Sequence, residues 1–264
     1  MLVERCCSTG GEAVEIISKS LPWNVEGVRL PAELFEKCII SLVDSSVSAQ
    51  HVDYINAAAD LLDTWTNDLF AVSSIKSNVS RRVKNCADVT VINGLKKLLA
   101  RIYLREGNIN KAVVLLIHLQ DPMVIDLVKK HHAITSMNEH VITHLNELFL
   151  IDKVSIIELL VKATKCKNIT VAEVINRLEV NEYALFCYLH GLFKSDGGVS
   201  IAKDFHSMQL ELYAKFDSSH LLPFLKQSSF YPLNKALEVC EEYELHRELV
   251  FVLGRMGSSK EHCR

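Results

Sequence analysis

Glycine and proline are scarce in this chain, with 10 and 5 copies in 264 residues. That is about half of what average usage would supply. Sandwiches and barrels of many short strands need frequent turn residues, so the shortage argues against them, and also against collagen and Pro/Gly-rich disorder. Hydrophobic residues make up 49% of the chain and charged residues 23%, which is enough apolar surface to fold. The composition therefore favours a helical globular protein.

No charge of one sign dominates, because 29 basic residues oppose 32 acidic ones for a net charge of −3. A basic excess is the footprint of nucleic-acid binding, so no nucleic-acid partner is predicted. Long hydrophobic runs are also missing. The longest apolar run within a predicted helix covers residues 112–117, far short of the roughly 20 residues that cross a bilayer. Glu4 and Arg5 interrupt any secretory signal, and we expect no transmembrane segment.

The eight cysteines contain no CxxC pair, and their spacing resembles neither a zinc site nor a disulfide framework. Three of them, Cys38, Cys187 and Cys240, lie among apolar residues, where free thiols behave as small hydrophobes. This usage indicates a reducing, cytoplasmic location. For the adjacent pair Cys6 and Cys7 two alternatives stay open, lipidation and an unmodified N-terminal segment.

Short catalytic and cofactor motifs are absent: there is no GxGxxG, GxxxxGK[ST], GxSxG, HExxH or EF-hand pattern. The most suggestive cluster comprises four histidines: His131, His132, His140 and His144. On one helix, His140 and His144 would share a face, but zinc needs a third and usually a fourth ligand. The alternative is a solvated set near the end of a helix, and this interpretation carries more weight. We predict no catalytic residue, no cofactor and no metal ligand.

Helical periodicity runs through the chain. One apolar stripe at helical spacing consists of Val91, Leu95, Leu98, Leu99 and Ile102. A second consists of Leu245, Leu249, Val252, Leu253 and Met256, and a narrower one of Val72, Ile75, Val79 and Val83. We expect twelve to fourteen helices joined by short turns.

Helix starts and stops can be recognised at several positions. Gly107 and Asn108 form a helix end, while Thr170 with Glu173 and Ser136 with Glu139 are capping-box pairs. Asn181 is a candidate cap of the helix that follows it, and residues 196–198 break the chain before a long helix that we expect to end near Asp217. Consecutive helices with short turns must lie antiparallel, so the natural unit is the helical hairpin. The pattern predicts an all-α fold, an α-solenoid of antiparallel hairpins of the clathrin-heavy-chain-repeat or tetratricopeptide-like kind.

Four blocks in the C-terminal half carry a resemblance to a known family: residues 185–193, 203–226, 232–240 and 249–257. Within them, LYAKFD followed by LLPFL, and then FVLGRMG, come in the family's order and spacing. These blocks resemble the vacuolar protein sorting-associated protein 41 family, subunits of the HOPS tethering complex. Residues 100–132 and 21–70 resemble it more weakly.

The resemblance implies a clathrin-heavy-chain-type repeat region that serves as a spacer and assembly surface. Accordingly we divide the chain into N-terminal helical hairpins (1–88), a repeat solenoid (89–257) and a truncated tail (258–264). The family's N-terminal β-propeller and C-terminal RING module have no counterpart in the sequence, and we expect a fragment, isoform or truncated gene model. Apolar residues of the last helix, Leu249, Val252 and Met256, would then stay partly uncovered.

The implied function is a non-enzymatic scaffold in vesicle-mediated transport and in fusion of late endosomes, autophagosomes and related carriers with the lysosome or vacuole. Its implied partners are other HOPS subunits and, through regions absent from this sequence, a Rab GTPase and adaptor-protein-3. Self-association is left open. The implied location is cytoplasmic, peripheral to late endosome and lysosome membranes. The alternative is a generic helical-repeat adaptor with different partners.

Overall fold

The computed structural model describes residues 32–66, 69–132 and 139–261, excluding the side chains of 140 and 258–261. Over these residues it contains sixteen α-helices, two short 3₁₀ helices and no strand. The predicted all-α class is confirmed. The expected number of helices was too low, because several are very short, such as α9 (Glu139–Thr143) and α14 (Gly198–Ile201).

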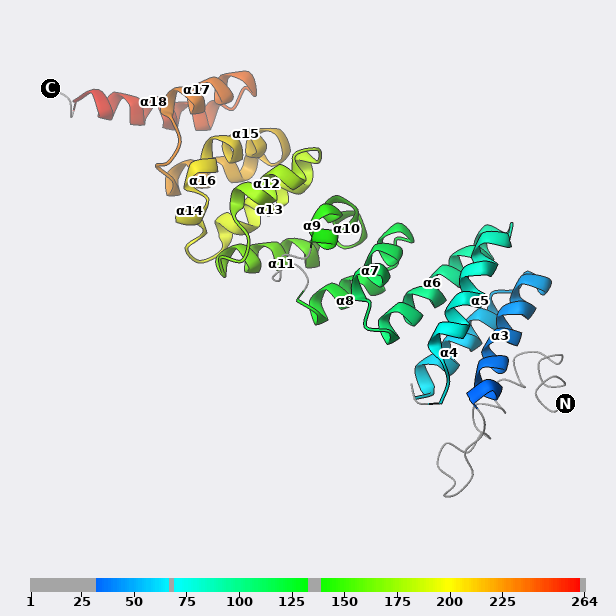
Figure 1. The fold of residues 1–264 in the computed structure, drawn as a ribbon. Coiled ribbons are helices and arrows are strands. Elements are labelled where there is room, and N and C mark those ends of the chain that lie inside the picture. Colours follow the sequence, from blue (N-terminus) through cyan, green and yellow to red (C-terminus); the bar gives the residue numbers. More distant parts are fainter. Residues whose placement is uncertain (1–31, 67–68, 133–138, 262–264) are drawn as a thin grey trace. The chain divides into compact units, whose positions relative to one another are not determined.

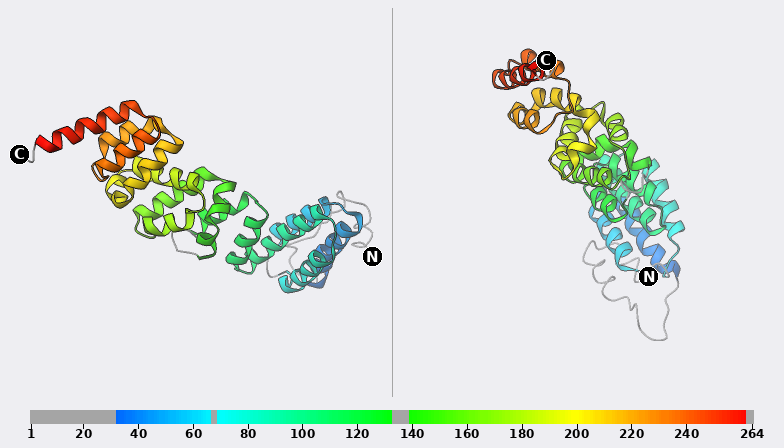
Figure 2. Two further views of the ribbon diagram at one scale, coloured as in Figure 1. Left: turned by 90° about the horizontal axis from the view of Figure 1, so that it is seen from above. Right: turned by 90° about the vertical axis from the view of Figure 1, so that its left-hand side faces the viewer.

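The chain divides into two compact units, Met1–Val124 and Ile125–Arg264. In the first, α3 lies against α4 and α5, and α6 lies against α4, α5 and α7 (Figures 1 and 2). The bounds are α3 Ala32–Ala49, α4 Asp53–Thr64, α5 Val72–Asn85, α6 Val89–Arg105 and α7 Ile109–His118.

The core of the first unit confirms the stripe predicted on α6, whose five members are all buried. Ile75 and Val79 of α5 are also buried, so the serine-rich segment is helical as expected. Trp65 fills the space beside α3, with its ring edge-on to Phe35 at a centroid distance of 4.9 Å. Burying a side chain of this size contributes a large share of the apolar stabilisation.

The second unit begins within α8 and consists of short helices. Besides α9 and α14, its helices are α8 Met123–Lys130, α10 Leu145–Ile151, α11 Lys153–Lys165, α12 Val171–Leu178, α13 Glu182–Lys194, α15 His206–Phe216, α16 Leu221–Gln227, α17 Leu233–Glu242 and α18 His246–Glu261. Consecutive helices lie against each other in the pairs α10 and α11, α12 and α13, and α17 and α18, and α13 also lies against α11 and α15. Repeated helical hairpins therefore build this unit.

Side-chain caps fix the start of two central helices. Thr170 accepts a hydrogen bond from the Glu173 amide, and the Glu173 carboxylate accepts one in return from the Thr170 amide, which completes the predicted capping box of α12. Asn181 accepts a hydrogen bond from the Ala184 amide at the start of α13, also as predicted. The Ser136 pair lies outside the described residues.

The segment after Gly198 differs from the expected long helix ending near Asp217. The short helix α14 and a 3₁₀ turn (Lys203–Phe205) precede α15, which begins only at His206. Gly197 has φ of +75°, and a Cβ on Gly198 would lie 1.7 Å from the Leu192 carbonyl oxygen. Only glycine fits where the chain folds back onto the end of α13, and the helix that begins at Gly198 ends after four residues.

The helix pairs at the C-terminal end are less buried than the sequence pattern indicates. Phe224 of α16 is fully buried, but Leu222 keeps partial exposure because Leu221 and Leu225 occupy the inward positions. Among the described side chains of α18, which are those of residues 246–257, only Val252 is buried, while Leu253 is 50% exposed. Expecting Val252 among the uncovered residues was therefore wrong.

Cross-helix polar contacts join segments that are close in sequence. Lys76 pairs with Glu106, Arg82 with Asp44 and Lys215 with Glu182, at separations of 30, 38 and 33 residues. The Arg105 guanidinium donates to the Trp65 carbonyl oxygen at 2.6 Å, across 40 residues. Each of these contacts therefore holds a helix to one from the same or the adjacent hairpin.

Candidate functional site

Three histidines of the cluster have described side chains, while the side chain of His140 lies outside the described residues. His131 and His132 lie exposed just after α8, and the helix that should carry His140 and His144 is broken, because α9 ends at Thr143. His144 instead precedes α10, where its Nδ1 lies 3.3 Å from Glu147 Oε1. No group of three or more histidine, cysteine, aspartate or glutamate side chains in the described residues is placed to hold a metal ion.

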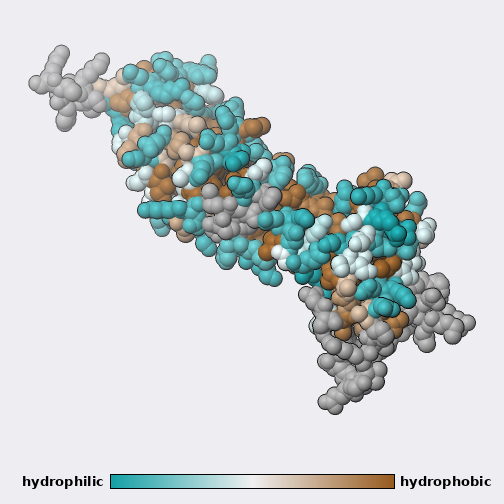
Figure 3. Space-filling view, in the orientation of Figure 1, coloured by the Kyte–Doolittle hydropathy of each residue, from teal (hydrophilic) through white to brown (hydrophobic). Residues whose placement is uncertain are grey.

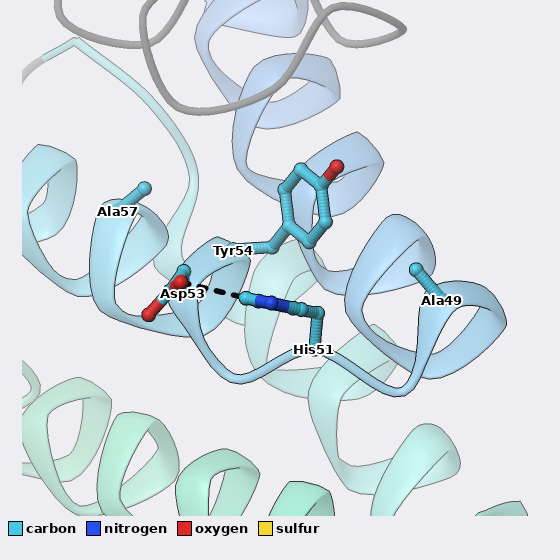
Figure 4. Close-up of a pocket in the computed structure, with 5 residues that line it drawn as sticks. All are labelled: Ala49, His51, Asp53, Tyr54 and Ala57. Atoms are coloured by element: carbon cyan, nitrogen blue, oxygen red, sulfur yellow. Dashed lines mark ion pairs between the residues drawn. The ribbon is translucent and has the colours of Figure 1, made fainter.

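A shallow pocket opens at the turn between α3 and α4, and Figure 4 shows the residues that line it. His51 Nδ1 lies 3.2 Å from Asp53 Oδ2, with the two side chains 62% and 79% exposed. Tyr54 completes the wall, its ring 6.1 Å from that of His51. An ion pair this open to water contributes little free energy, and no serine, threonine, cysteine or lysine lines this pocket beside the imidazole.

A second depression lies between α4 and α6, over Gly94. A Cβ at this position would lie 2.9 Å from Ile55 Cδ1, so the glycine permits close approach of the two helices. Two cations border the depression and each has a carboxylate partner: Lys97 with Asp121, and Arg101 with Asp63. The positive charges at the border of this depression are therefore neutralised by carboxylates of the same chain.

A buried polar network of the second unit surrounds Tyr213 of α15. Its hydroxyl lies 2.9 Å from His190 Nδ1 and accepts a hydrogen bond from Gln209 Nε2 at 3.1 Å. Burial raises the pKa of Tyr213 to about 12, and burial, with Lys194 and His220 nearby, lowers the pKa of His190. A phenol that stays protonated and an imidazole held neutral satisfy each other's hydrogen bonds, which is a structural role.

A second buried histidine, His206, lies at the start of α15 with no exposed surface. Its Nδ1 is 2.5 Å from Ser228 Oγ, and aromatic rings of Phe193, Phe224 and Phe230 surround it. Burial lowers its pKa, so the neutral imidazole is the form that fits this site. The sequence offered no signal for either histidine, because their partners are 22 and 23 residues away.

The expected apolar role holds for two of the three cysteines singled out: Cys38 and Cys240 are buried, while Cys187 is partly exposed. Burial raises the pKa of Cys240 to about 11, so this thiol remains protonated and unreactive.

The surface shown in Figure 3 is mainly polar, with apolar side chains scattered between. No helix of the described residues is long and apolar enough to cross a membrane. What the geometry offers is therefore a set of helix faces and ridges, suited to contact with other macromolecules.

Comparison with known proteins agrees with this arrangement. The family model of the Vps41 TPR-like region matches residues 11–264. The chain belongs to this family. A vacuolar protein sorting-associated protein 41 homolog of Solanum lycopersicum is 31% identical over 242 residues, covering 89% of this chain and 23% of that protein. The Homo sapiens homolog is 31% identical over 202 residues, covering 76% and 22%.

The Vps41 family extends further, to the Saccharomyces cerevisiae protein, which is 24% identical over 234 residues, covering 79% of this chain and 24% of that protein. The chain therefore spans about a quarter of the length of these relatives. No solved structure matches it. The resemblance seen in the sequence is confirmed, and so is the all-α solenoid class, since the matched Vps41 region is TPR-like.

Proposed function

We propose that this chain is a non-enzymatic scaffold segment of a tethering-complex subunit that acts in protein sorting to the vacuole or lysosome. The observation that carries the proposal is the match of the Vps41 TPR-like region to residues 11–264. Relatives named for vacuolar protein sorting support it. The helical hairpins of the described residues also support an assembly role.

In this proposal the chain acts by binding other proteins on its helix faces, without a chemical step. Stacked hairpins present rigid helix faces, and partner subunits bind by burying apolar and aromatic side chains inside a polar rim. The partners proposed are other HOPS subunits, and the location is the cytoplasmic side of late endosome and lysosome membranes. We propose that the chain is divided as the sequence predicts, into the N-terminal helical hairpins of residues 1–88, the repeat solenoid of residues 89–257 and the tail of residues 258–264.

The proposal is tested by co-purification. The tagged chain and a matched full-length family member are expressed in the same cells, and the proteins they retain are quantified by mass spectrometry. Recovery of HOPS subunits by the chain itself is the expected result. Recovery by the full-length protein alone would contradict an assembly role for this segment, and recovery of other trafficking proteins in place of HOPS subunits would favour a generic helical-repeat adaptor.

A further inference from the structure

Two half-exposed aromatic rings lie side by side in the second unit, where α13 begins and α15 ends. Tyr183 is 42% exposed and Phe216 36%, and their ring centroids are 5.6 Å apart. A lysine ammonium lies over each ring: Lys153 Nζ is 5.7 Å from the centroid of Tyr183, and Lys215 Nζ is 5.5 Å from that of Phe216. We call these four residues the aromatic–lysine strip.

Buried rings underneath hold the strip in place. Phe186 lies 6.0 Å from Tyr183 and 5.6 Å from Phe216, and Phe149 lies 6.3 Å from Tyr183. Both supporting side chains are almost fully buried. The exposed rings are therefore already ordered, so a partner that covers them loses little additional side-chain entropy. Exposed aromatics on a rigid support are the residue type that dominates binding energy at protein interfaces.

The charge of the strip is opposite to that of the chain. Of its two ammonium groups, that of Lys215 pairs with the carboxylate of Glu182. The strip with its acidic neighbour thus carries one net positive charge, whereas the whole chain carries −3. Lys153 is exposed and offers ammonium donors beside the Tyr183 ring. A carboxylate adjacent to an apolar side chain complements this combination.

We infer that the aromatic–lysine strip is a docking surface for an acidic segment of a partner protein, one that places a carboxylate on Lys153 and an apolar side chain on the Tyr183 and Phe216 rings. The inference rests on the proposed scaffold function and adds the location and chemistry of one contact. A protein is favoured over an anionic membrane, because lipid-binding clusters usually hold about 4–8 basic residues and the strip has two lysines.

The probes are three fluorescent twelve-residue peptides with identical leucine positions and four variable positions filled by Glu, Gln or Lys. Their binding to the whole chain is measured by fluorescence anisotropy at two salt concentrations. We expect the Glu peptide to bind tightest and to weaken as salt rises, because the rim contact is electrostatic. Equal affinity for all three peptides would overturn the inference.

Two variants locate the binding. Lys153→Glu reverses the charge in the strip, and Lys165→Glu makes the same change at an exposed position at the other end of α11. We expect Lys153→Glu to weaken binding of the Glu peptide about tenfold, the usual effect of losing a charge-assisted contact, and Lys165→Glu to leave it nearly unchanged. Equal losses of affinity in both variants would show a general charge effect and would refute binding of the peptide at the aromatic–lysine strip.

A third variant tests the apolar half of the contact. Tyr183→Ser removes one exposed ring, and circular dichroism verifies that helicity is retained. Weakened binding of the Glu peptide is expected, and unchanged binding contradicts docking on the rings. Binding of wild-type chain to phosphatidylserine vesicles that is lost in Lys153→Glu, without peptide binding, would assign the strip to a membrane instead.

The same variants separate this inference from the proposed function. If wild-type chain and Lys153→Glu recover HOPS subunits equally, the scaffold function stands and the strip is not the contact used. If wild-type chain recovers no HOPS subunit but binds the Glu peptide through Lys153, the scaffold proposal fails while the acidic-segment chemistry of the strip is supported.

Discussion

Replacing Phe224 by alanine should destabilise the second unit strongly. The side chain is fully buried, and four rings surround it at centroid distances of 5.0 Å (Phe193), 5.3 Å (His206 and Tyr213) and 6.0 Å (Tyr231). A buried Phe→Ala change costs about 3–5 kcal/mol, as lost transfer free energy plus the cavity left behind. Four rigid rings cannot all move into the space, so we expect a value near the upper end.

Phe230→Ala is the matched control. Phe230 is 48% exposed and touches the same cluster through His206, at 5.6 Å. About half of its apolar area is already in water, so its loss should cost roughly 1–1.5 kcal/mol. The assay is urea unfolding followed by far-ultraviolet circular dichroism, with hydrogen exchange of the α13 and α15 amides to assign the change to this unit. If the two variants differ by less than about 1 kcal/mol, Phe224 is not the centre of the cluster.

Three further changes probe caps and titrating groups. Thr170→Ala should cost about 1 kcal/mol in urea unfolding, because it removes one half of the α12 capping box, while Thr170→Ser should cost much less. Tyr213 has a pKa of about 12 in the folded chain against 10 unfolded, so its contribution to stability is complete below pH 10 and is lost as pH rises towards 12. The urea midpoint of Tyr213→Phe should fall less between pH 10 and pH 12 than that of the wild type, and an equal fall in both proteins would contradict the burial of Tyr213. His206 has a lowered pKa, so its contribution is present above pH 6.5 and is lost as pH falls below it. The midpoint of His206→Gln should therefore fall less between pH 7 and pH 5 than that of the wild type.

Sequence reasoning succeeded where the signal is local. The stripe on α6 and the caps at Thr170 and Asn181 depend on residues within one or two helical turns, and the structure has them as predicted. It failed after Gly198, where a four-residue helix and a 3₁₀ turn precede α15 in place of one long helix. The Leu192 carbonyl oxygen that lies close to Gly198 belongs to the preceding helix α13, and no pattern in the sequence indicates this contact.

The candidate histidine site and the proposed aromatic–lysine strip were harder to predict for the same reason. The break before His144 separates two histidines that a continuous helix would have aligned. Tyr183 and Phe216 have the periodicity of core residues, but their rings stay 42% and 36% exposed although α13 packs on α15. Periodicity identifies which side of a helix is apolar, but it does not say whether another helix or a partner will cover it.

The short sequence separations of the cross-helix contacts have a consequence for synthesis. The Arg105 contact with Trp65 needs 40 residues of chain, and the pairs Lys76–Glu106 and Lys215–Glu182 need fewer. At about 5–20 residues per second, a ribosome supplies such a length in a few seconds. Each hairpin can then pack against the preceding one while the rest of the chain is still being synthesised. The apolar face of a helix is therefore exposed to water only for the short time before the next helix covers it.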